Sequence, residues 1–155
     1  MHRKKIILDI SHMADRAVAD GFELWRGPIM SSHSNARDLM PGDRQITNAT
    51  AAEIARRGGM LGISFYEHHL KSGGHATLDD IVRHAVHLAR AAGGPEHVGL
   101  GSDLDGGFDA KHSAMQDTRQ FNELSRKLRK EFGASQVEGI MGTNWLGFLA
   151  TSLPA

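Results

Sequence analysis

The stretches IILDISH (residues 6–12) and GPIMSSH (residues 27–33) decide the fold expected for this 155-residue chain. Each is a short apolar run that ends in a histidine, His12 or His33. Neither run alternates cleanly between apolar and polar residues, so both predict strands that are buried on two faces. Such strands belong to parallel sheets, whose carboxyl ends form the ligand-binding edge. We therefore expect His12 and His33 to lie side by side at that edge.

Strands and helices alternate along the rest of the chain. The sequence predicts strands at 5–11, 28–32, 60–66 and 97–102, and helices at 15–24, 50–57, 77–92, 117–132, 135–141 and 145–153. This alternation indicates an α/β fold with a parallel sheet and right-handed crossovers. We predict one domain, residues 1–155, made of four βα units with extra C-terminal helices. Periodicity alone leaves two architectures open, half of a (β/α)8 barrel or a small open sheet.

Helix-capping signals set several of these boundaries. Asn48 is the expected cap of the helix at 50–57, and Thr77 with Asp80 forms an expected capping box. The helix at 77–92 carries an apolar stripe of Ile81, Ala85, Leu88, Ala89 and Ala92. His84 and His87 lie three residues apart on this helix, away from the strand ends, and are expected at the surface.

Composition excludes several classes of protein. Eighteen basic residues balance eighteen acidic ones, so no net charge attracts nucleic acid or anionic lipid. The absence of cysteine excludes disulfides and thiolate metal sites. The opening MHRKKIILDI is basic and then apolar, but its apolar run is too short for a signal peptide or a membrane span. We expect a soluble, cytoplasmic protein.

His12 and His33 are candidate metal ligands. A single histidine at the end of a strand is weak evidence, but neighbouring strands lie about 4.8 Å apart, so two imidazoles can meet on one ion. A catalytic zinc usually takes three protein ligands and a water. The two histidines therefore supply only part of such a site.

Two further residues are candidates for substrate contacts. Asp103, in the run GSDLDGG (101–107), can hold an ammonium group or transfer a proton, and its alternative is a simple Asx-type turn. The same run resembles a calcium loop, which fails because Ala114 occupies the twelfth position, and the motif of phosphatases that use an aspartate nucleophile. Arg44 can clamp a carboxylate, or it is a solvated loop residue.

Six blocks of this sequence, taken in order, resemble the membrane (renal) dipeptidase family. They are IILDISHMAD, GPIMSSHSNAR, DRQIT, RRGGMLGISFY, ATLDDIVRHAVHLARAAGGPEHVGLGSDLDGG and IMGTNWLGFL. The resemblance spans nearly the whole chain. It implies a zinc-dependent dipeptidase with a (β/α)8 barrel, of which this chain resembles the C-terminal half.

The resemblance also implies roles for the candidate residues. The family uses two bridged zinc ions; His12 and His33 match ligands of the second ion. Arg44 matches the arginine that binds the substrate carboxylate, and Asp103 matches the aspartate beside the substrate amino group that assists proton transfer. In such an enzyme a metal-bound hydroxide attacks the peptide carbonyl.

The remaining metal ligands of the family, an H-x-D pair and a bridging glutamate, belong to an N-terminal half that this sequence does not contain. We therefore expect at most half of the zinc site and little turnover by this chain alone. The expected partners are a dipeptide substrate and either an N-terminal half-chain or a second copy, since the end strands of half a barrel have free edges. The alternatives are a non-catalytic fragment and, less favoured, a phosphatase with Asp103 as nucleophile.

Overall fold

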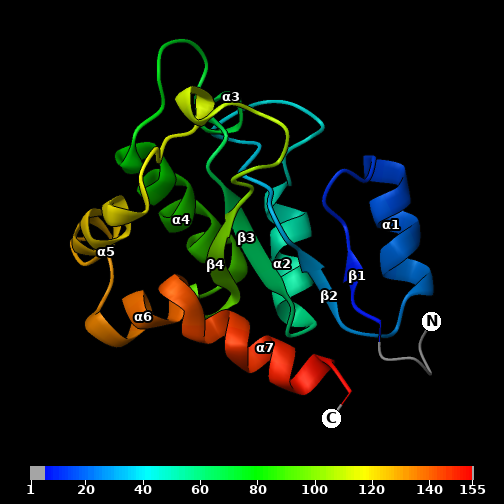
Figure 1. The fold of residues 1–155 in the computed structure, drawn as a ribbon. Coiled ribbons are helices and arrows are strands. Elements are labelled where there is room, and N and C mark those ends of the chain that lie inside the picture. The colour runs from blue at the N-terminus through cyan, green and yellow to red at the C-terminus, as the bar shows by residue number, and fades with distance from the viewer. Residues whose placement is uncertain (1–5, 155) are drawn as a thin grey trace.

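The chain folds around a four-stranded parallel sheet in the computed structural model, which describes residues 6–154 (Figure 1). The strands β1 (Leu8–Asp9), β2 (Ile29–Ser31), β3 (Met60–Ser64) and β4 (Val98–Ser102) pair in sequence order. A doubly wound sheet reverses its strand order at a switch point, whereas a barrel adds each strand beside the preceding one. The predicted α/β class is confirmed, and this strand order is that of half a (β/α)8 barrel.

The observed strands are shorter than the sequence predicts. The first was expected at 5–11, where Lys5 lies outside the described residues, and β1 ends at Asp9. Its end has a local cause, because the Asp9 carboxylate accepts the Ser11 N–H at 3.0 Å and His12 turns into the left-handed region at a φ of 68°. Side-chain hydrogen bonds of this kind compete with strand pairing.

The helices follow the expected order, with changes at their boundaries. They are α1 (Asp15–Leu24), α2 (Asn48–Arg56), α3 (Glu67–Leu70), α4 (Leu78–Ala92), α5 (Phe121–Leu128), α6 (Ala134–Glu138) and α7 (Asn144–Ser152), with a π-helical turn at Gly139–Thr143. The four-residue α3 was not predicted. Helix α5 is shorter than the expected 117–132, because a 3-10 turn at Thr118–Gln120, capped by Asp117, precedes it.

The caps agree with the sequence at one helix and differ at another. At α4 the capping box of Thr77 and Asp80 is present, with the Thr77 N–H donating to Asp80 Oδ2 at 2.9 Å. At α2 the cap is Thr47, whose hydroxyl accepts the Thr50 N–H at 3.1 Å, so the expectation for Asn48 was wrong by one residue. A threonine serves this purpose as well as an asparagine does.

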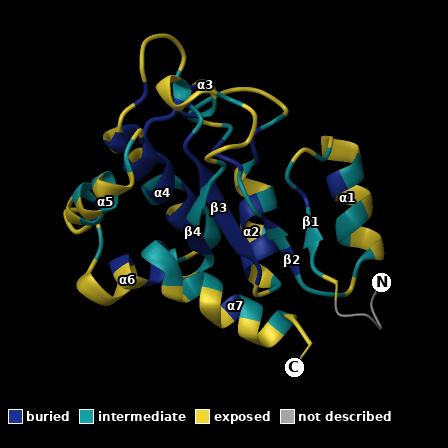
Figure 2. Cartoon of the chain, viewed as in Figure 1, coloured by how far each residue is buried: buried dark blue, intermediate teal, exposed yellow. Residues whose placement is uncertain are grey.

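The hydrophobic core lies between the sheet and helices α2 and α4, which cover the back of the sheet in Figure 1. All five residues of β3 are buried, as Figure 2 shows. Ile54 of α2 and Ile81 and Leu88 of α4 are fully buried against the sheet. A central strand covered on both faces explains why its sequence does not alternate.

His84 of α4 is buried, so its expected place at the surface was wrong. Its Nδ1 accepts the N–H of Ala36 at 3.1 Å, and its Nε2 donates to the carbonyl of Leu70 at 3.0 Å. The helical period explains the burial, because His84 follows Ile81 by three residues and precedes Leu88 by four on the same face. His84 thereby joins the segment that follows β2 to the end of α3.

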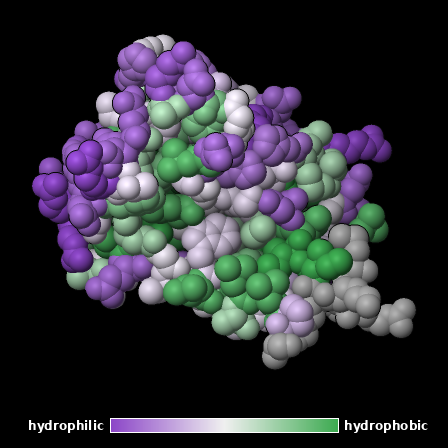
Figure 3. Space-filling view, viewed as in Figure 1, coloured by the Kyte–Doolittle hydropathy of each residue, from purple (hydrophilic) through white to green (hydrophobic). Residues whose placement is uncertain are grey.

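The outer edge of β4 is partly covered by α7. The Asn144 amide donates to the carbonyl of Val98 at 2.8 Å, and the Trp145 indole donates to the carbonyl of Leu100 at 3.1 Å. These two carbonyls are therefore unavailable for adding another strand. Apolar surface gathers over α7 (Figure 3), where Leu146 is 67% exposed. No helix in the described part of the chain is long and apolar enough to cross a membrane.

Candidate functional site

His12 and His33 meet at the carboxyl ends of β1 and β2. Their Nε2 atoms are 2.9 Å apart, and their ring centroids are separated by 5.0 Å. His12 holds a φ of 68°, a conformation that few residues other than glycine adopt and that is concentrated at functional sites. The structure thus brings the two imidazoles together, as the strand pattern predicts.

Asp9 fixes the backbone on which both histidines stand. One carboxylate oxygen, Oδ1, accepts the N–H groups of Ser11 and Ser32, each at 3.0 Å. Burial raises the pKa of Asp9, but hydrogen bonds from these two serines outweigh it and leave the pKa below its usual value. Asp9 was not predicted as part of the site, although a lone carboxylate inside an apolar strand was the available signal.

Hydrogen bonds also orient the His33 ring. Ser32 Oγ lies 2.6 Å from His33 Nδ1 and donates to Ser11 Oγ at 3.3 Å. Because the serine proton is used there, Nδ1–H donates to Ser32 and Nε2 keeps its lone pair. Burial lowers the pKa of His33, and the nearby Arg44 lowers it further. A neutral ring with a free Nε2 is the form that binds a metal ion.

Arg44 lies beside the histidines rather than in solvent. Its Nη1 donates to Ser34 Oγ at 2.9 Å, and its Nη2 donates to the carbonyl of His33 at 2.8 Å. The buried Nε atom has no hydrogen-bond partner within the described part of the chain. Burial lowers the pKa of Arg44, although the nearby Asp103 opposes this. The guanidinium thus retains one buried donor for another acceptor.

Asp103 follows β4 and faces His33. Its Oδ1 is 3.9 Å from His33 Nε2, and Asp103 itself has a φ of 61°. Gly106 makes room for it, because a Cβ there would lie 2.2 Å from Asp103 Oδ1. The main-chain carbonyl of Asp103, not its carboxylate, accepts the Gly106 N–H. The carboxylate of this turn therefore faces the imidazole pair.

His69 of α3 lies near the same group, while its neighbour His68 points elsewhere. Burial lowers the pKa of His69 to about 4, and the positive charge of Arg44 contributes. Its Nδ1 is a second buried atom without a hydrogen-bond partner in residues 6–154. His68 is 61% exposed and lies against Glu67. The two adjacent histidines of α3 therefore face different surroundings.

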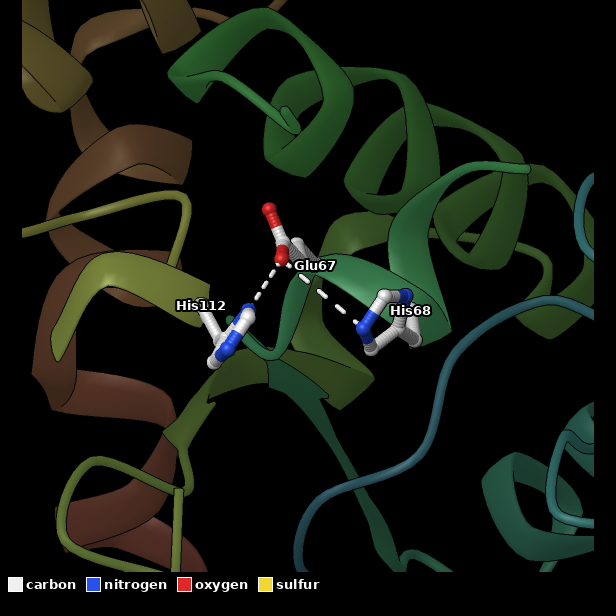
Figure 4. Close-up of side chains that lie close together, drawn as sticks. All are labelled: Glu67, His68 and His112. Atoms are coloured by element: carbon white, nitrogen blue, oxygen red, sulfur yellow. Dashed lines mark hydrogen bonds and ion pairs between the residues drawn. The ribbon is translucent and has the colours of Figure 1, made fainter. Parts of the chain in front are cut away.

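A second group of ligand-type side chains consists of Glu67, His68 and His112. One ligand atom from each lies within 4.8 Å of the others (Figure 4). His112 comes from the 3-10 turn Ala110–His112, after β4. Neither Glu67 nor His112 was predicted as a ligand, because 45 residues separate them and no local spacing pairs them. We call this group the Glu67 cluster.

The imidazole pair fits one half of a zinc site. In a tetrahedral zinc centre with bonds of about 2.1 Å, two ligand nitrogens lie about 3.4 Å apart, so the pair at 2.9 Å needs only a small opening. Asp103, 3.9 Å from His33, is the nearest carboxylate recorded around that ring. Within residues 6–154 the pair therefore provides two nitrogen ligands, where a catalytic zinc normally has three protein ligands.

Comparison with known proteins identifies relatives over nearly the whole chain. The membrane dipeptidase family (peptidase family M19) matches residues 1–151. An uncharacterized dipeptidase of Schizosaccharomyces pombe is 32% identical over 150 residues, covering 94% of this chain and 36% of that protein. Dipeptidase tcpJ of Claviceps purpurea is 30% identical over 146 residues, covering 93% of this chain and 34% of that protein. The chain thus spans about a third of the length of these curated relatives.

Solved structures give the same result. A dipeptidase of family M19 superposes with a TM-score of 0.87 at 28% identity, covering 99% of this chain and 46% of the other. A metallopeptidase from Rhodobacter sphaeroides, bound to a phosphinate mimic of the dipeptide L-Ala-D-Ala, gives the same score and identity and covers 97% and 44%. The four βα units of this chain correspond to somewhat less than half of these enzymes, whose fold is a TIM barrel.

Proposed function

Since this chain belongs to the membrane dipeptidase family, we propose that it supplies the carboxyl-terminal half of a metal-dependent dipeptidase active site. The observation that carries the proposal is the approach of His12 Nε2 and His33 Nε2 to 2.9 Å at the ends of adjacent parallel strands. Two imidazole nitrogens that face each other at the ends of adjacent strands can bind one divalent ion after a small opening of the pair. Zinc is the ion that this ligand type and this family favour.

Each remaining residue has a role that follows from its surroundings. A metal ion held by His12 and His33 would polarise the carbonyl of a peptide bond. Arg44 would bind the substrate carboxylate, because its guanidinium lies beside both histidines of the pair. Asp103 would hold the substrate amino group and transfer a proton, because its carboxylate lies beside the imidazoles. A dipeptide carries a carboxylate at one end and an ammonium group at the other, which Arg44 and Asp103 could bind together.

Assembly is a second proposed role, supported by the ligand count. The pair offers two imidazoles, whereas a catalytic zinc normally takes three protein ligands, so a complete site needs at least one ligand from outside residues 6–154. An N-terminal half-chain or a second copy of this chain would do so. A chain that assembles without turnover is the corresponding non-catalytic alternative. A phosphatase with Asp103 as nucleophile is less favoured, because the family match concerns dipeptidases.

The test measures zinc content and hydrolysis of L-Ala-D-Ala on the same purified sample, with and without added Zn²⁺. We expect His33→Ala to lower zinc binding at this site and His87→Ala, which changes an imidazole bonded to Asn48, to leave it unchanged. Turnover should appear only with the complementary half-chain or in an oligomer. A zinc content that is the same in His33→Ala as in the unsubstituted chain would refute the proposed site.

A phosphatase predicts a different pattern of results. Its activity would require Mg²⁺, would be lost in Asp103→Asn, and would survive His12→Ala. A dipeptidase would instead lose activity in His12→Ala, because the metal ligand is removed. Comparing these two variants on a dipeptide and on a phosphate monoester separates the two functions.

A further inference from the structure

We propose that the Glu67 cluster is a second zinc-type metal site, separate from the imidazole pair, that links the segments following β3 and β4. Glu67 belongs to α3, directly after β3, and His112 lies in the turn after β4. Figure 4 shows Glu67, His68 and His112 directed toward one another from these two segments. This proposal stands on residues that the proposed dipeptidase site does not use.

The Glu67 carboxylate is unusual because it is almost buried and faces imidazoles. Its side chain is 6% exposed, and its recorded ion pairs within residues 6–154 are with His68, His75 and His112. No lysine or arginine within residues 6–154 is recorded in an ion pair with this carboxylate. A divalent cation would supply the positive charge and use the same nitrogens as ligands.

The ligand atoms are close to the spacing that zinc needs. Glu67 Oε1 is 2.5 Å from His112 Nδ1 and 3.8 Å from His68 Nε2. These values bracket the separation of about 3.4 Å that tetrahedral zinc imposes on its ligands. His68 is 61% exposed and His112 is 38% exposed, so both rings can shift by about an ångström at little cost.

The backbone around the cluster is already held in place. The Ala114 N–H donates to the carbonyl of Phe65 at 2.8 Å, and Tyr66 pairs with Ser113 in an antiparallel bridge. The two segments are therefore joined before an ion binds, which lowers the entropic cost of binding it. His75 is not one of the three proposed ligands but orients the Glu67 carboxylate, because its Nδ1 lies 3.0 Å from Glu67 Oε2.

Two imidazoles and one carboxylate specify the class of ion. Nitrogen ligands of this kind suit Zn²⁺, Co²⁺ or Ni²⁺, whereas Mg²⁺ and Ca²⁺ prefer all-oxygen sites. Three protein ligands would leave a fourth position for water. We assign no reaction to this position; the ion would stabilise the loops that border the imidazole pair.

The test uses the chain with His12→Ala and His33→Ala, which removes the other candidate ligands while leaving the Glu67 cluster intact. Co²⁺ is titrated and followed by its visible absorption, and Zn²⁺ is then added in competition. We expect one ion per chain, with the strong absorption bands of tetrahedral Co²⁺. Adding His112→Ala should weaken binding by at least about tenfold, since even outer-shell changes cost 10–100-fold.

Control variants make the result decisive. His87→Ala removes an imidazole that is hydrogen-bonded to the Asn48 side chain, and it should change the affinity for Co²⁺ less than twofold. Glu67→Gln should abolish binding. If this buried change prevents folding, His68→Ala at an exposed residue and His112→Ala at a half-buried one test the same site. Binding that is absent in the starting variant, or that is unaffected by His112→Ala, would overturn the proposal. Neither result bears on the dipeptidase site, whose histidines are already removed.

Discussion

His84→Leu is expected to destabilise the fold strongly at neutral pH and hardly at all near pH 4. His84 is fully buried, accepts the Ala36 N–H through Nδ1, and donates through Nε2 to the carbonyl of Leu70. Leucine fills a similar volume but makes neither bond. The Leu70 carbonyl keeps a second donor, Arg83 Nη2 at 3.0 Å, so the Ala36 N–H is the group left without its partner.

The magnitude follows from these contacts. A buried N–H without a partner costs about 1–3 kcal/mol, and the lost Nε2 bond adds about 1 kcal/mol. Burying leucine in place of imidazole returns about 1 kcal/mol. The expected loss in the free energy of unfolding at pH 7 is therefore about 1–3 kcal/mol.

The pH dependence is a separate quantity, the stability that the wild type loses because buried His84 resists protonation. Burial lowers the pKa of His84 from 6.5 to about 4, which corresponds to about 3 kcal/mol. Because the folded-state pKa is the lower one, this stability is complete above pH 6.5 and is lost as the pH falls toward 4. His84→Leu has no such group, so its deficit relative to the wild type should vanish near pH 4.

Urea unfolding of both proteins at several pH values between 4 and 7.5 measures this difference. His87→Leu is the matched control, three residues along the same helix, where the imidazole bonds the Asn48 side chain at the surface. It should cost less than about 0.5 kcal/mol. A deficit of His84→Leu that stays constant with pH, or an equal loss in His87→Leu, would refute the reasoning.

Three further substitutions test other contacts. Gly99→Ala should destabilise the protein by about 1–3 kcal/mol in urea unfolding, because a Cβ there would lie 2.3 Å from Trp145 Nε1 and strain the cover of β4. Gly147→Ala in α7 should instead stabilise it by about 0.5–1 kcal/mol, since a Cβ there meets nothing within 4 Å and alanine favours the helix. Asp9→Ala releases the two N–H groups that hold the turn before His33 and should weaken zinc binding about 10–100-fold in a calorimetric titration. Unchanged zinc affinity in this last variant would show that the turn holds its shape without the carboxylate.

The cover on β4 also bears on assembly. The sequence predicts free edges on the two end strands. At β4, however, two backbone carbonyls already accept hydrogen bonds from the side chains of Asn144 and Trp145. The first strand has no such cover recorded among the described residues, and its two residues are only partly buried. Strand addition by a partner is therefore expected at β1 rather than at β4.

The amino-acid sequence by itself determined the class of fold and the members of the imidazole pair. Apolar runs that do not alternate predict buried parallel strands, and a histidine at the end of each of two successive strands predicts their approach. The capping box of α4 was also readable, because the interactions that form it span only a few residues. Such features depend on local patterns, which the sequence records directly.

The tertiary structure alone decided the features that join distant segments. The strand order distinguishes half a barrel from an open sheet, and it arises from packing between units that the periodicity describes one at a time. His84 holds Ala36, 48 residues away, and Glu67 meets His112, 45 residues away. Hydrogen bonds of this kind form only after the strands are in register, so no spacing within the sequence predicts them.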